Sequence, residues 1–591
     1  MIAYVIQYRK RKGGTNVKKL LIYLKDYKKE SILGPLFKLL EATFELFVPL
    51  VMAAIIDTGI ANGDRPFITK MCFVLILLGL VGLVSSVTAQ YFAAKAAVGF
   101  STKLRYALFQ HIQSLSFSEM DTVGTSTLIT RMTSDINQVQ SGVNMALRLF
   151  LRSPFIVLGA MIMAFTIDVK AALIFVITIP VLSIVVFGIM KITIPLYKKV
   201  QSGLDEVLSI TRENLTGIRV VRAFNKQESE IEHFDDRNDS LTNWQQFVGR
   251  ISALTNPLTF VVVNVATAAL IWSGAIRVNN GAITQGQLIA LVNYMSQILV
   301  ELVKFANLIV TVTKAVACAN RVESILSTES SMNITGTKIP DKKGDIIVDF
   351  DHVGLTYKNA GEESLTDIHF SVKRGETIGI IGGTGSGKSS LVNMIPRFYD
   401  ATKGCVRGNG IDVKEYDIQS LRDQIGTVLQ KAVLFKGTIR ENLLWGNGDA
   451  TDEDIWEAIE VSQSKEFVEQ KDGKLDFVIE QNGKNLSGGQ RQRLTIARAL
   501  VRHPEILIMD DSASALDFAT DARLRQAIKK LDKDLTVFIV SQRAASIQFA
   551  DKIIVLDDGE VVGMGTHEEL LNNCEVYQEI YYSQFPKEAN V

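Results

Sequence analysis

The sequence predicts a chain of two fold classes, an α-helical transmembrane domain with six helices followed by an α/β domain. Six apolar stretches in the first 325 residues are long enough to cross a bilayer core, which requires about 20 residues per helix. From residue 345 onward, short apolar strands alternate with helical segments, as in an α/β domain. A glycine-rich loop at 382–389 joins one of these strands to a helix, and we expect chemistry there.

The composition fits a membrane protein and argues against a nucleic-acid-binding protein, a disulfide scaffold and a cysteine metal site. Apolar residues make up 47% of the 591 residues, and they are concentrated in the first half. Lys+Arg and Asp+Glu both total 63, so no basic excess indicates a nucleic-acid partner. The four cysteines, at 72, 318, 405 and 574, have neither CxxC nor metal-site spacing. We therefore expect free thiols rather than disulfides or a metal centre.

The six predicted membrane spans are separated by connections of unequal length. The spans cover roughly 32–56, 71–92, 146–167, 171–190, 254–276 and 286–312. The connections near 93–145 and 191–253 are long and polar, and both carry apolar residues at helical spacing. We therefore expect the membrane helices to continue into the aqueous phase on that side.

Charge distribution predicts the orientation of the chain in the plasma membrane. Nine Lys/Arg residues precede Ser31, whereas the short connections carry few. By the positive-inside rule, both termini and both long connections are cytoplasmic. Within the N-terminal tail, "VKKLLIYLKDYKK" reads as an amphipathic helix that lies along the membrane surface.

Four charged residues lie within the predicted spans, where charge is costly. Glu41 and Glu45 share one helix face, and Glu301 and Lys304 share another. One interpretation is that they line a substrate cavity. The other is that Glu301 and Lys304 form an internal pair, or lie near the cytoplasmic interface.

Changes in composition predict the domain boundaries. We expect a cytoplasmic tail and elbow helix at 1–30, a transmembrane domain with two long cytoplasmic extensions at 31–327, a linker at 328–344, and an α/β nucleotide-binding domain at 345–585.

The glycine-rich loop fits the P-loop pattern G-x-x-x-x-G-K-[ST] between a strand and a helix. Its backbone N–H groups can bind phosphate oxygens, Lys388 can reach the β- and γ-phosphates, and the Ser389 hydroxyl can ligate Mg²⁺. Downstream, "PEILIMDD" is a buried strand that ends at Asp510, the expected second Mg²⁺ ligand. Together these motifs predict a P-loop nucleotide site with Mg²⁺ ligands, but they do not decide which kind of P-loop protein this is. The predicted nucleotide-binding residues of this segment are Gly382, Gly383, Thr384, Gly385, Ser386, Gly387, Lys388, Ser389 and Ser390.

The string LSGGQ at 486–490, followed by a basic helix and the acid-tipped strand, resembles the ATP-binding cassette family. Together with six spans, it resembles a half-transporter of the ABC exporter type over residues 18–585. The resemblance implies that Tyr357 stacks on adenine and that Gln430 contacts Mg²⁺ and the attacking water. It also implies that the loop 512–517 crosses a dimer interface, and that 217–228 and 116–131 include coupling helices.

LSGGQ has a physical reading of its own. Ser487, Gly488, Gly489 and Gln490 open a helix, where free N–H groups form an anion site. One chain cannot close that site over its own P-loop if the two lie apart in the domain. A second cassette in head-to-tail arrangement would let each signature cover the other's ATP, and the family has this arrangement.

Two residues depart from the family's hydrolytic pattern. The family has Glu after the Mg²⁺ aspartate and His in a later switch loop, whereas this chain has Asp511 and Gln542. Shortening Glu to Asp withdraws the carboxylate by roughly 1.5 Å, and a misplacement of about 1 Å can cost about a hundredfold in rate. Gln542 cannot accept a proton as imidazole can. The candidate catalytic residues are therefore Asp511, Gln542 and Gln430. We expect the site that contains them to bind ATP but to hydrolyse it poorly.

The sequence thus predicts an ABC-type transporter ATPase whose own Walker site is impaired. It resembles the degenerate-site subunit of heterodimeric bacterial multidrug exporters, which move amphipathic small molecules, lipids or peptides out of the cytoplasm by alternating access. The expected partners are a second half-transporter, the lipid bilayer and the substrate. Two alternatives stay open: an ATP-binding regulatory or gated membrane protein with negligible hydrolysis, and a homodimeric exporter with Asp511 as its base.

Overall fold

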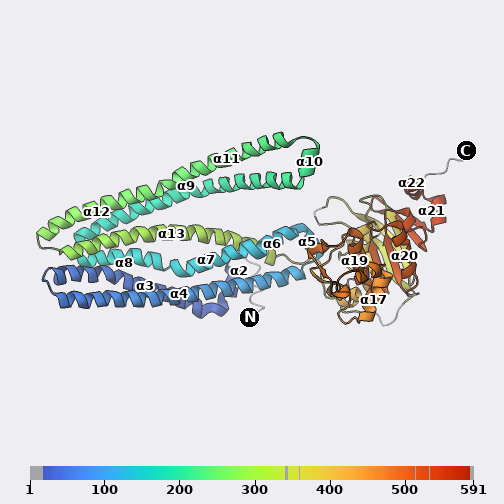
Figure 1. Cartoon of the computed structure of the whole chain (residues 1–591), viewed down its shortest axis with the longest axis horizontal. Coiled ribbons are helices and arrows are strands. Elements are labelled where there is room, and N and C mark those ends of the chain that lie inside the picture. Colours follow the sequence, from blue (N-terminus) through green and yellow to red (C-terminus); the bar gives the residue numbers. More distant parts are fainter. Residues whose placement is uncertain (1–16, 340–343, 359, 513, 532, 586–591) are drawn as a thin grey trace. The chain divides into compact units, whose positions relative to one another are not determined.

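The computed structural model describes residues 17–339, 344–358, 360–512, 514–531 and 533–585, and it divides into two compact units (Figure 1). The first unit comprises Met1–Gln113 and Ser126–Thr328, and the second comprises Ser114–Thr125 and Glu329–Val591. Parts of two predicted segments, residues 1–16 of the tail and 340–343 of the linker, lie outside the described residues. The boundaries of the four segments drawn from composition stay predictions.

The first unit is entirely helical where it is described. It begins with a short helical segment, α2 and the 3₁₀ helix η2, that runs without a break into the first long helix. The helices are α2 (Val17–Leu20), η2 (Leu21–Tyr27), α3 (Lys28–Ala54), the π-helix η3 (Ile55–Ile60), α4 (Arg65–Ser114), α6 (Thr125–Thr130), the π-helix η4 (Arg131–Asp135), α7 (Ile136–Leu149), α8 (Arg152–Ile167), α9 (Val169–Thr216), α10 (Ile218–Ala223), α11 (Gln227–Ala253), α12 (Thr255–Asn279) and α13 (Gln285–Leu326).

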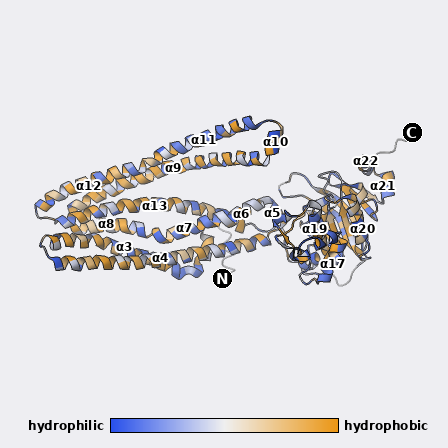
Figure 2. Cartoon of the chain, in the orientation of Figure 1, coloured by the Kyte–Doolittle hydropathy of each residue, from blue (hydrophilic) through white to orange (hydrophobic). Residues whose placement is uncertain are grey.

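Six helical stretches among the described residues are long and apolar enough to cross a membrane. They are Leu21–Ile60, Arg65–Ser114, Thr125–Ile167, Val169–Thr216, Gln227–Asn279 and Gln285–Leu326. Each contains one predicted span, so the predicted count of six is confirmed. The helices extend well past the spans, and Figure 2 shows hydrophilic residues along α10 and α11, as the polar periodicity of the long connections predicted.

These helices expose large apolar side chains, as expected for segments that lie in a membrane or against a partner chain. Trp272, Ile184 and Phe73 are each at least 66% exposed, whereas α13 packs its buried face against α3, α7, α8 and α12. Burying small residues such as Ala290 and Ala164 lets neighbouring helices approach closely.

The structure modifies two sequence expectations in this unit. The predicted span 146–167 is interrupted, because α7 ends at Leu149 and α8 begins only at Arg152. The predicted surface helix at the N-terminus is helical, but its centre, Leu21–Tyr27, is a 3₁₀ helix. Leu20 is buried there while Leu21 and Ile22 are exposed, so one face packs and the other stays free.

The second unit is built on two β-sheets. A six-stranded sheet has the order β12-β11-β3-β10-β9-β6, in which all neighbours pair in parallel except β11 and β12. An antiparallel sheet has the order β2-β1-β4-β5, and β7 pairs with β8. The strands are β1 (Ile346–Leu355), β2 (Leu365–Lys373), β3 (Thr377–Gly382), β4 (Lys403–Gly408), β5 (Ile411–Asp412), β6 (Ile425–Val428), β7 (Gly437–Thr438), β8 (Val478–Ile479), β9 (Ile506–Asp510), β10 (Thr536–Val540), β11 (Lys552–Asp557) and β12 (Glu560–Gly565).

Helices cover the parallel sheet, as expected for strands with continuous apolar runs. All five residues of β9 and of β10 are buried. The helices of this unit are α5 (Phe117–Val123), α14 (Lys388–Asn393), α15 (Ile418–Asp423), α16 (Ile439–Leu443), α17 (Asp452–Val461), α18 (Lys465–Glu469), η5 (Lys474–Asp476), η6 (Gln481–Gly483), α19 (Gly488–Leu500), α20 (Phe518–Ile528), η7 (Ala544–Ser546), α21 (His567–Asn573) and α22 (Glu575–Gln584).

Helix α5 belongs to the second unit although long helices of the first unit flank it in sequence. The Phe117 ring packs on Phe398 with 4.7 Å between ring centroids. Beside it, the buried Glu119 accepts hydrogen bonds from Ser116 and from the backbone N–H of Ser331. Burial opposes ionisation of Glu119, but these hydrogen bonds outweigh it and lower the pKa of that carboxyl.

Candidate nucleotide-binding site

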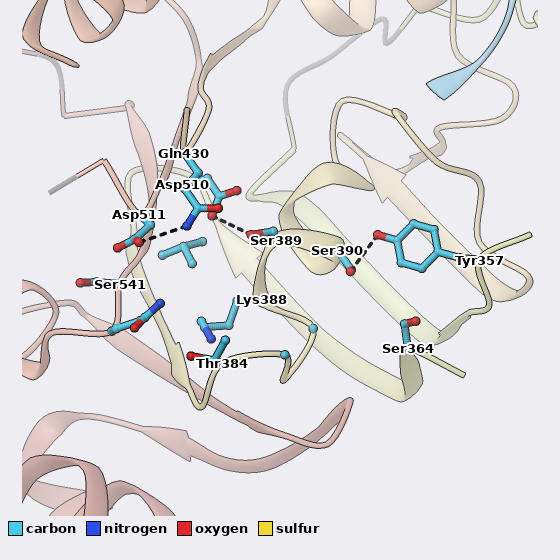
Figure 3. A pocket seen from close by; sticks show the side chains of 14 residues that line it. Tyr357, Ser364, Thr384, Lys388, Ser389, Ser390, Gln430, Asp510, Asp511 and Ser541 are labelled. Atoms are coloured by element: carbon cyan, nitrogen blue, oxygen red, sulfur yellow. Dashed lines mark hydrogen bonds between the residues drawn. The ribbon is translucent and has the colours of Figure 1, made fainter. Parts of the chain in front are cut away.

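A cavity of about 330 Å³ opens in the second unit (Figure 3). Most of its walls come from the carboxyl ends of β3, β6, β9 and β10 and the residues after them, because the carboxyl ends of parallel strands meet at one edge of a sheet. The segment between β1 and β2 supplies Tyr357 and Ser364. The lining residues are Tyr357, Ser364, Thr384, Gly385, Gly387, Lys388, Ser389, Ser390, Gln430, Asp510, Asp511, Val540, Ser541 and Gln542.

The glycine loop connects β3, which ends at Gly382, to α14, which begins at Lys388. Gly387 has φ +91°, a conformation that residues with side chains rarely adopt. A Cβ atom there would lie 2.7 Å from Leu365 Cδ2 and 2.9 Å from the carbonyl oxygen of Ser364. Glycine is therefore required at this position for both conformation and space.

Lys388 holds its ammonium group inside this loop. Its Nζ donates to the carbonyl oxygens of Gly382 and Gly383, at 3.0 and 2.5 Å, and to Ser386 Oγ at 3.3 Å. Burial lowers the pKa of Lys388. A buried cation among backbone N–H groups is a suitable receptor for phosphate oxygens.

Two side chains with oxygen atoms that can ligate a hard cation, Ser389 and Asp510, lie next to each other in the cavity wall. The Ser389 hydroxyl donates to Asp510 Oδ1 at 3.0 Å, and burial raises the pKa of Asp510. Hydroxyl and carboxylate oxygens are the donors that Mg²⁺ takes alongside substrate phosphates. The donor set therefore fits Mg²⁺ with a nucleotide, for which Ser389 and Asp510 would be the protein ligands.

Asp511, Gln430 and Gln542 meet at the same end of the cavity. Gln430 Nε2 donates to Asp511 Oδ2 at 3.4 Å, and Gln542 lines the wall beside them. Asp511 has φ +45°, and its N–H donates to the carbonyl of Val540, which fixes the backbone at this turn. The three predicted candidate catalytic residues are therefore close together.

Tyr357 forms the opposite wall. Its hydroxyl lies 2.9 Å from Ser390 Oγ, and burial raises its pKa (Figure 3). The ring of Tyr399 meets it edge-on, with 5.1 Å between centroids. Tyr399 in turn donates its hydroxyl to Asp121 of α5 at 2.6 Å. An aromatic wall beside a phosphate-binding loop can accept the base of a nucleotide by stacking.

The LSGGQ residues lie outside this cavity. Ser487 is the N-cap of α19: its hydroxyl accepts from the N–H of Gln490, and the Gln490 side chain accepts from the N–H of Ser487. Gly489 lies close to the loop after β9, since a Cβ there would be 3.2 Å from the Ala515 carbonyl. The signature residues do not line the cavity formed by the P-loop of the same chain, which meets the condition under which one chain cannot close its signature over its own P-loop.

Comparison with known families agrees with both halves of the structure. Residues 31–302 match the family model of the ABC transporter transmembrane region, and residues 365–514 match that of the ABC transporter cassette. A relative from Mycobacterium tuberculosis, an uncharacterized ABC transporter ATP-binding protein, is 36% identical over 570 residues, covering 95% of this chain and 97% of its own length.

The chain belongs to the ABC transporter family.

Two other relatives of this ABC transporter carry more specific names. A Bacillus subtilis protein, YgaD, named as a candidate multidrug export ATP-binding/permease protein, is 31% identical over 591 residues, covering 96% of this chain and 99% of its own length. An ATP-dependent lipid A-core flippase from Vibrio vulnificus is 27% identical over 569 residues, covering 96% and 97%.

Three lining residues of the transporter's cavity were not predicted from the sequence: Ser364, Val540 and Ser541. Ser364 precedes β2 and reaches the site through its contact with the glycine loop, which no local pattern announces. Val540 is the last residue of β10, and Ser541 follows it directly before Gln542. The order of β10 beside β3 places them there, and that order cannot be inferred from a single strand.

The Tyr399–Asp121 hydrogen bond gives a prediction about α5. Tyr399→Phe keeps the ring but removes the hydroxyl, and a hydrogen bond of about 1 kcal/mol corresponds to about a fivefold change in local opening. We expect the amides of α5 to exchange with deuterium about fivefold faster. Tyr106→Phe, whose ring is 70% exposed, is the control and should leave α5 unchanged. Equal exchange in both variants would contradict the prediction.

Proposed function

We propose that this chain is one subunit of a heterodimeric, ATP-driven ABC exporter. In this proposal the chain holds ATP in a degenerate site of its own and contributes LSGGQ to the hydrolytic site of its partner. Both termini are cytoplasmic, and the transmembrane helices carry amphipathic small molecules, lipids or peptides outward by alternating access.

The observation that carries the proposal is the composition of the cavity around Asp511. The binding groups, Lys388, Ser389 and Asp510, are all in place. The position beside Mg²⁺ holds a carboxylate one methylene shorter than Glu, and Gln542 offers an amide that cannot take up a proton. A site that binds well and lacks an effective base favours retention of ATP over hydrolysis.

Each group has a definite task in this proposal. The glycine loop and Lys388 bind the phosphates, and Tyr357 stacks on the base. Ser389, Asp510 and Gln430 hold Mg²⁺, which neutralises phosphate charge when bound. Because the Asp511 carboxylate is one methylene shorter than Glu, it would orient an attacking water poorly. The bound state would then be long-lived and would stabilise the closed pair of cassettes.

A polar cavity in the first unit supports transport of molecules with a polar group. The cavity, of about 370 Å³, lies between α3 and α13, and both Glu45 and Lys304 reach it. Lys304 also pairs with Glu301 at 2.9 Å, as the second interpretation expected, whereas Glu41 pairs with Lys38 and does not line the cavity. The names of the relatives, lipid A-core flippase and candidate multidrug exporter, fit substrates that combine polar and apolar parts.

The first experiment identifies the partner subunit. The tagged chain is purified from native membranes, and any copurifying half-transporter is identified by mass spectrometry. We expect a second subunit with Glu and His at the positions of Asp511 and Gln542. The chain alone should bind ATP with little turnover, and the pair should hydrolyse it; Asp511→Ala should scarcely change the rate of the pair.

Two results would overturn the proposal in favour of the alternatives. If the chain copurifies only with itself and Asp511→Ala abolishes a substantial ATPase activity, it is a homodimeric exporter with Asp511 as base. If neither the chain nor its complex hydrolyses ATP while nucleotide still changes its conformation, it is a regulatory or gated membrane protein.

A further inference from the structure

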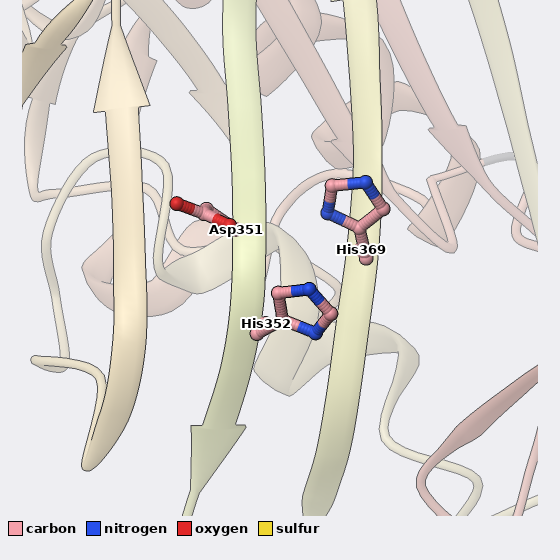
Figure 4. Close-up of side chains that lie close together, drawn as sticks. All are labelled: Asp351, His352 and His369. Carbon is pink, nitrogen blue, oxygen red and sulfur yellow. The ribbon is translucent and has the colours of Figure 1, made fainter.

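A second cluster of ligating side chains lies on the antiparallel sheet of the second unit (Figure 4). Asp351, His352 and His369 each offer one ligand atom within 4.8 Å of the others. The two imidazole rings lie nearly parallel, with 4.9 Å between centroids. None of the three belongs to the cavity described above.

A β-bulge brings the three side chains together. Phe350 pairs with Phe370 and Val353 with Ile368, so two residues of β1 stand opposite His369 alone. The extra residue, His352, has φ +50°, in the left-handed region that a β-strand residue does not normally adopt. A bulge re-aims side chains, and here it turns consecutive residues toward one neighbour on the edge strand β2.

Two of the three side chains, His352 and Asp351, have hydrogen-bond partners of the kind that orient metal ligands. His352 Nδ1 lies 2.6 Å from Asp367 Oδ1, and this hydrogen bond leaves Nε2 as the nitrogen available for a metal. Asp351 accepts from Arg407 at 2.9 Å through Oδ2, which leaves Oδ1. Metal-ligating histidines usually donate their second N–H to a carboxylate, and ligating carboxylates are themselves hydrogen-bonded.

Charge favours a divalent cation here. Arg407 pairs with Asp349 and Asp351, whereas Asp367 contacts His352. Three carboxylates and one guanidinium leave two negative charges around the cluster when the histidines are neutral. Two imidazoles and a carboxylate form a donor set that suits Zn²⁺, and the exposed side leaves a fourth position for water.

We propose that Asp351, His352 and His369 form a Zn²⁺-binding site that cross-links β1 and β2, separate from the Mg²⁺ site of the nucleotide. The site lies on β1, and Tyr357 follows the end of that strand. Bound metal would therefore fix β1 just before the segment that carries Tyr357. The proposal does not depend on the function of the Asp511 site.

The test uses the full-length chain, purified without a histidine tag and titrated calorimetrically with ZnCl₂ in the absence of nucleotide. We expect one Zn²⁺ per chain, and we expect His352→Gln or His369→Gln to weaken binding by more than about tenfold. His503→Gln is the matched control: His503 also has positive φ and faces a carboxylate, Asp454, but it belongs to no three-ligand cluster among the described residues.

Two further variants distinguish this site from the nucleotide site and test its orienting carboxylate. Asp510→Asn changes the nucleotide site and should leave the Zn²⁺ affinity unchanged. Asp367→Asn keeps all three ligands but removes the orienting carboxylate, and it should weaken binding about tenfold. Co²⁺ should give visible d–d absorption that His369→Gln removes. Zn²⁺ affinity unchanged by both histidine variants, or weakened equally by His503→Gln, would overturn the proposal.

Discussion

Introducing Asp511→Glu and Gln542→His together is expected to raise the ATPase activity of the purified chain on the order of a hundredfold. The longer carboxylate advances by roughly 1.5 Å toward the position of the attacking water, and the imidazole supplies a group that can exchange a proton. The measurement is phosphate release from nanodiscs that hold two copies of the chain, so that each LSGGQ can cover a restored site.

Three controls accompany this pair of substitutions. Each single variant should have a lower ATPase rate than the double variant. The two side chains act on the same water, so their effects on the rate are not additive. Adding Lys388→Ala should remove the gain, since that ammonium group lies in the phosphate loop. A double variant as slow as the parent would show that the rate is limited elsewhere, and the proposal of a degenerate site would fail.

Arg152→Met is expected to cause the largest loss of stability. Arg152 is buried and joins Glu301 at 2.6 Å to Glu45 at 2.6 Å. Removing Arg152 leaves Glu45 and Glu301 with one cation fewer, since only Lys304 then pairs with Glu301. Breaking a buried ion pair costs about 3–5 kcal/mol, which corresponds to roughly 10 °C in apparent unfolding temperature for a domain of this size. Thermal unfolding in lipid nanodiscs, followed by fluorescence, measures the change.

The matched variant removes the carboxylates as well. Arg152→Met combined with Glu45→Gln and Glu301→Gln leaves no unpaired buried anion at this point, so most of the lost stability should return. A single variant as stable as the parent would mean that water reaches Glu301, despite its 3% side-chain exposure.

The sequence predicted the fold class well because its signals are local. A run of apolar residues long enough for a bilayer, or a strand that leads into a glycine loop, can be recognised without knowledge of the rest of the chain. Lys388, in the loop and helix that follow β3, and Asp511, directly after β9, were found in this way. Because strands of a parallel sheet end at one edge, their proximity could also be anticipated.

The features that were missed depend on contacts between distant segments. Arg152 was not singled out because its neighbours in sequence are apolar, and its partners Glu45 and Glu301 lie more than 100 residues away. The histidine cluster was missed for a related reason. His352 and His369 come together only through the register of β1 on β2 and the bulge between them.

Helix α5 has a consequence for how such a chain can be altered by recombination. The second unit is discontinuous: a gene fragment that starts at Glu329 omits the 12 residues Ser114–Thr125. Phe117 and Asp121 would then be absent, leaving Phe398 and Tyr399 without the contacts they make here. A chimera that exchanges only the C-terminal segment joins a foreign surface to a native α5. An exchange that preserves these contacts must therefore transfer both the C-terminal segment and residues Ser114–Thr125 from the same parent.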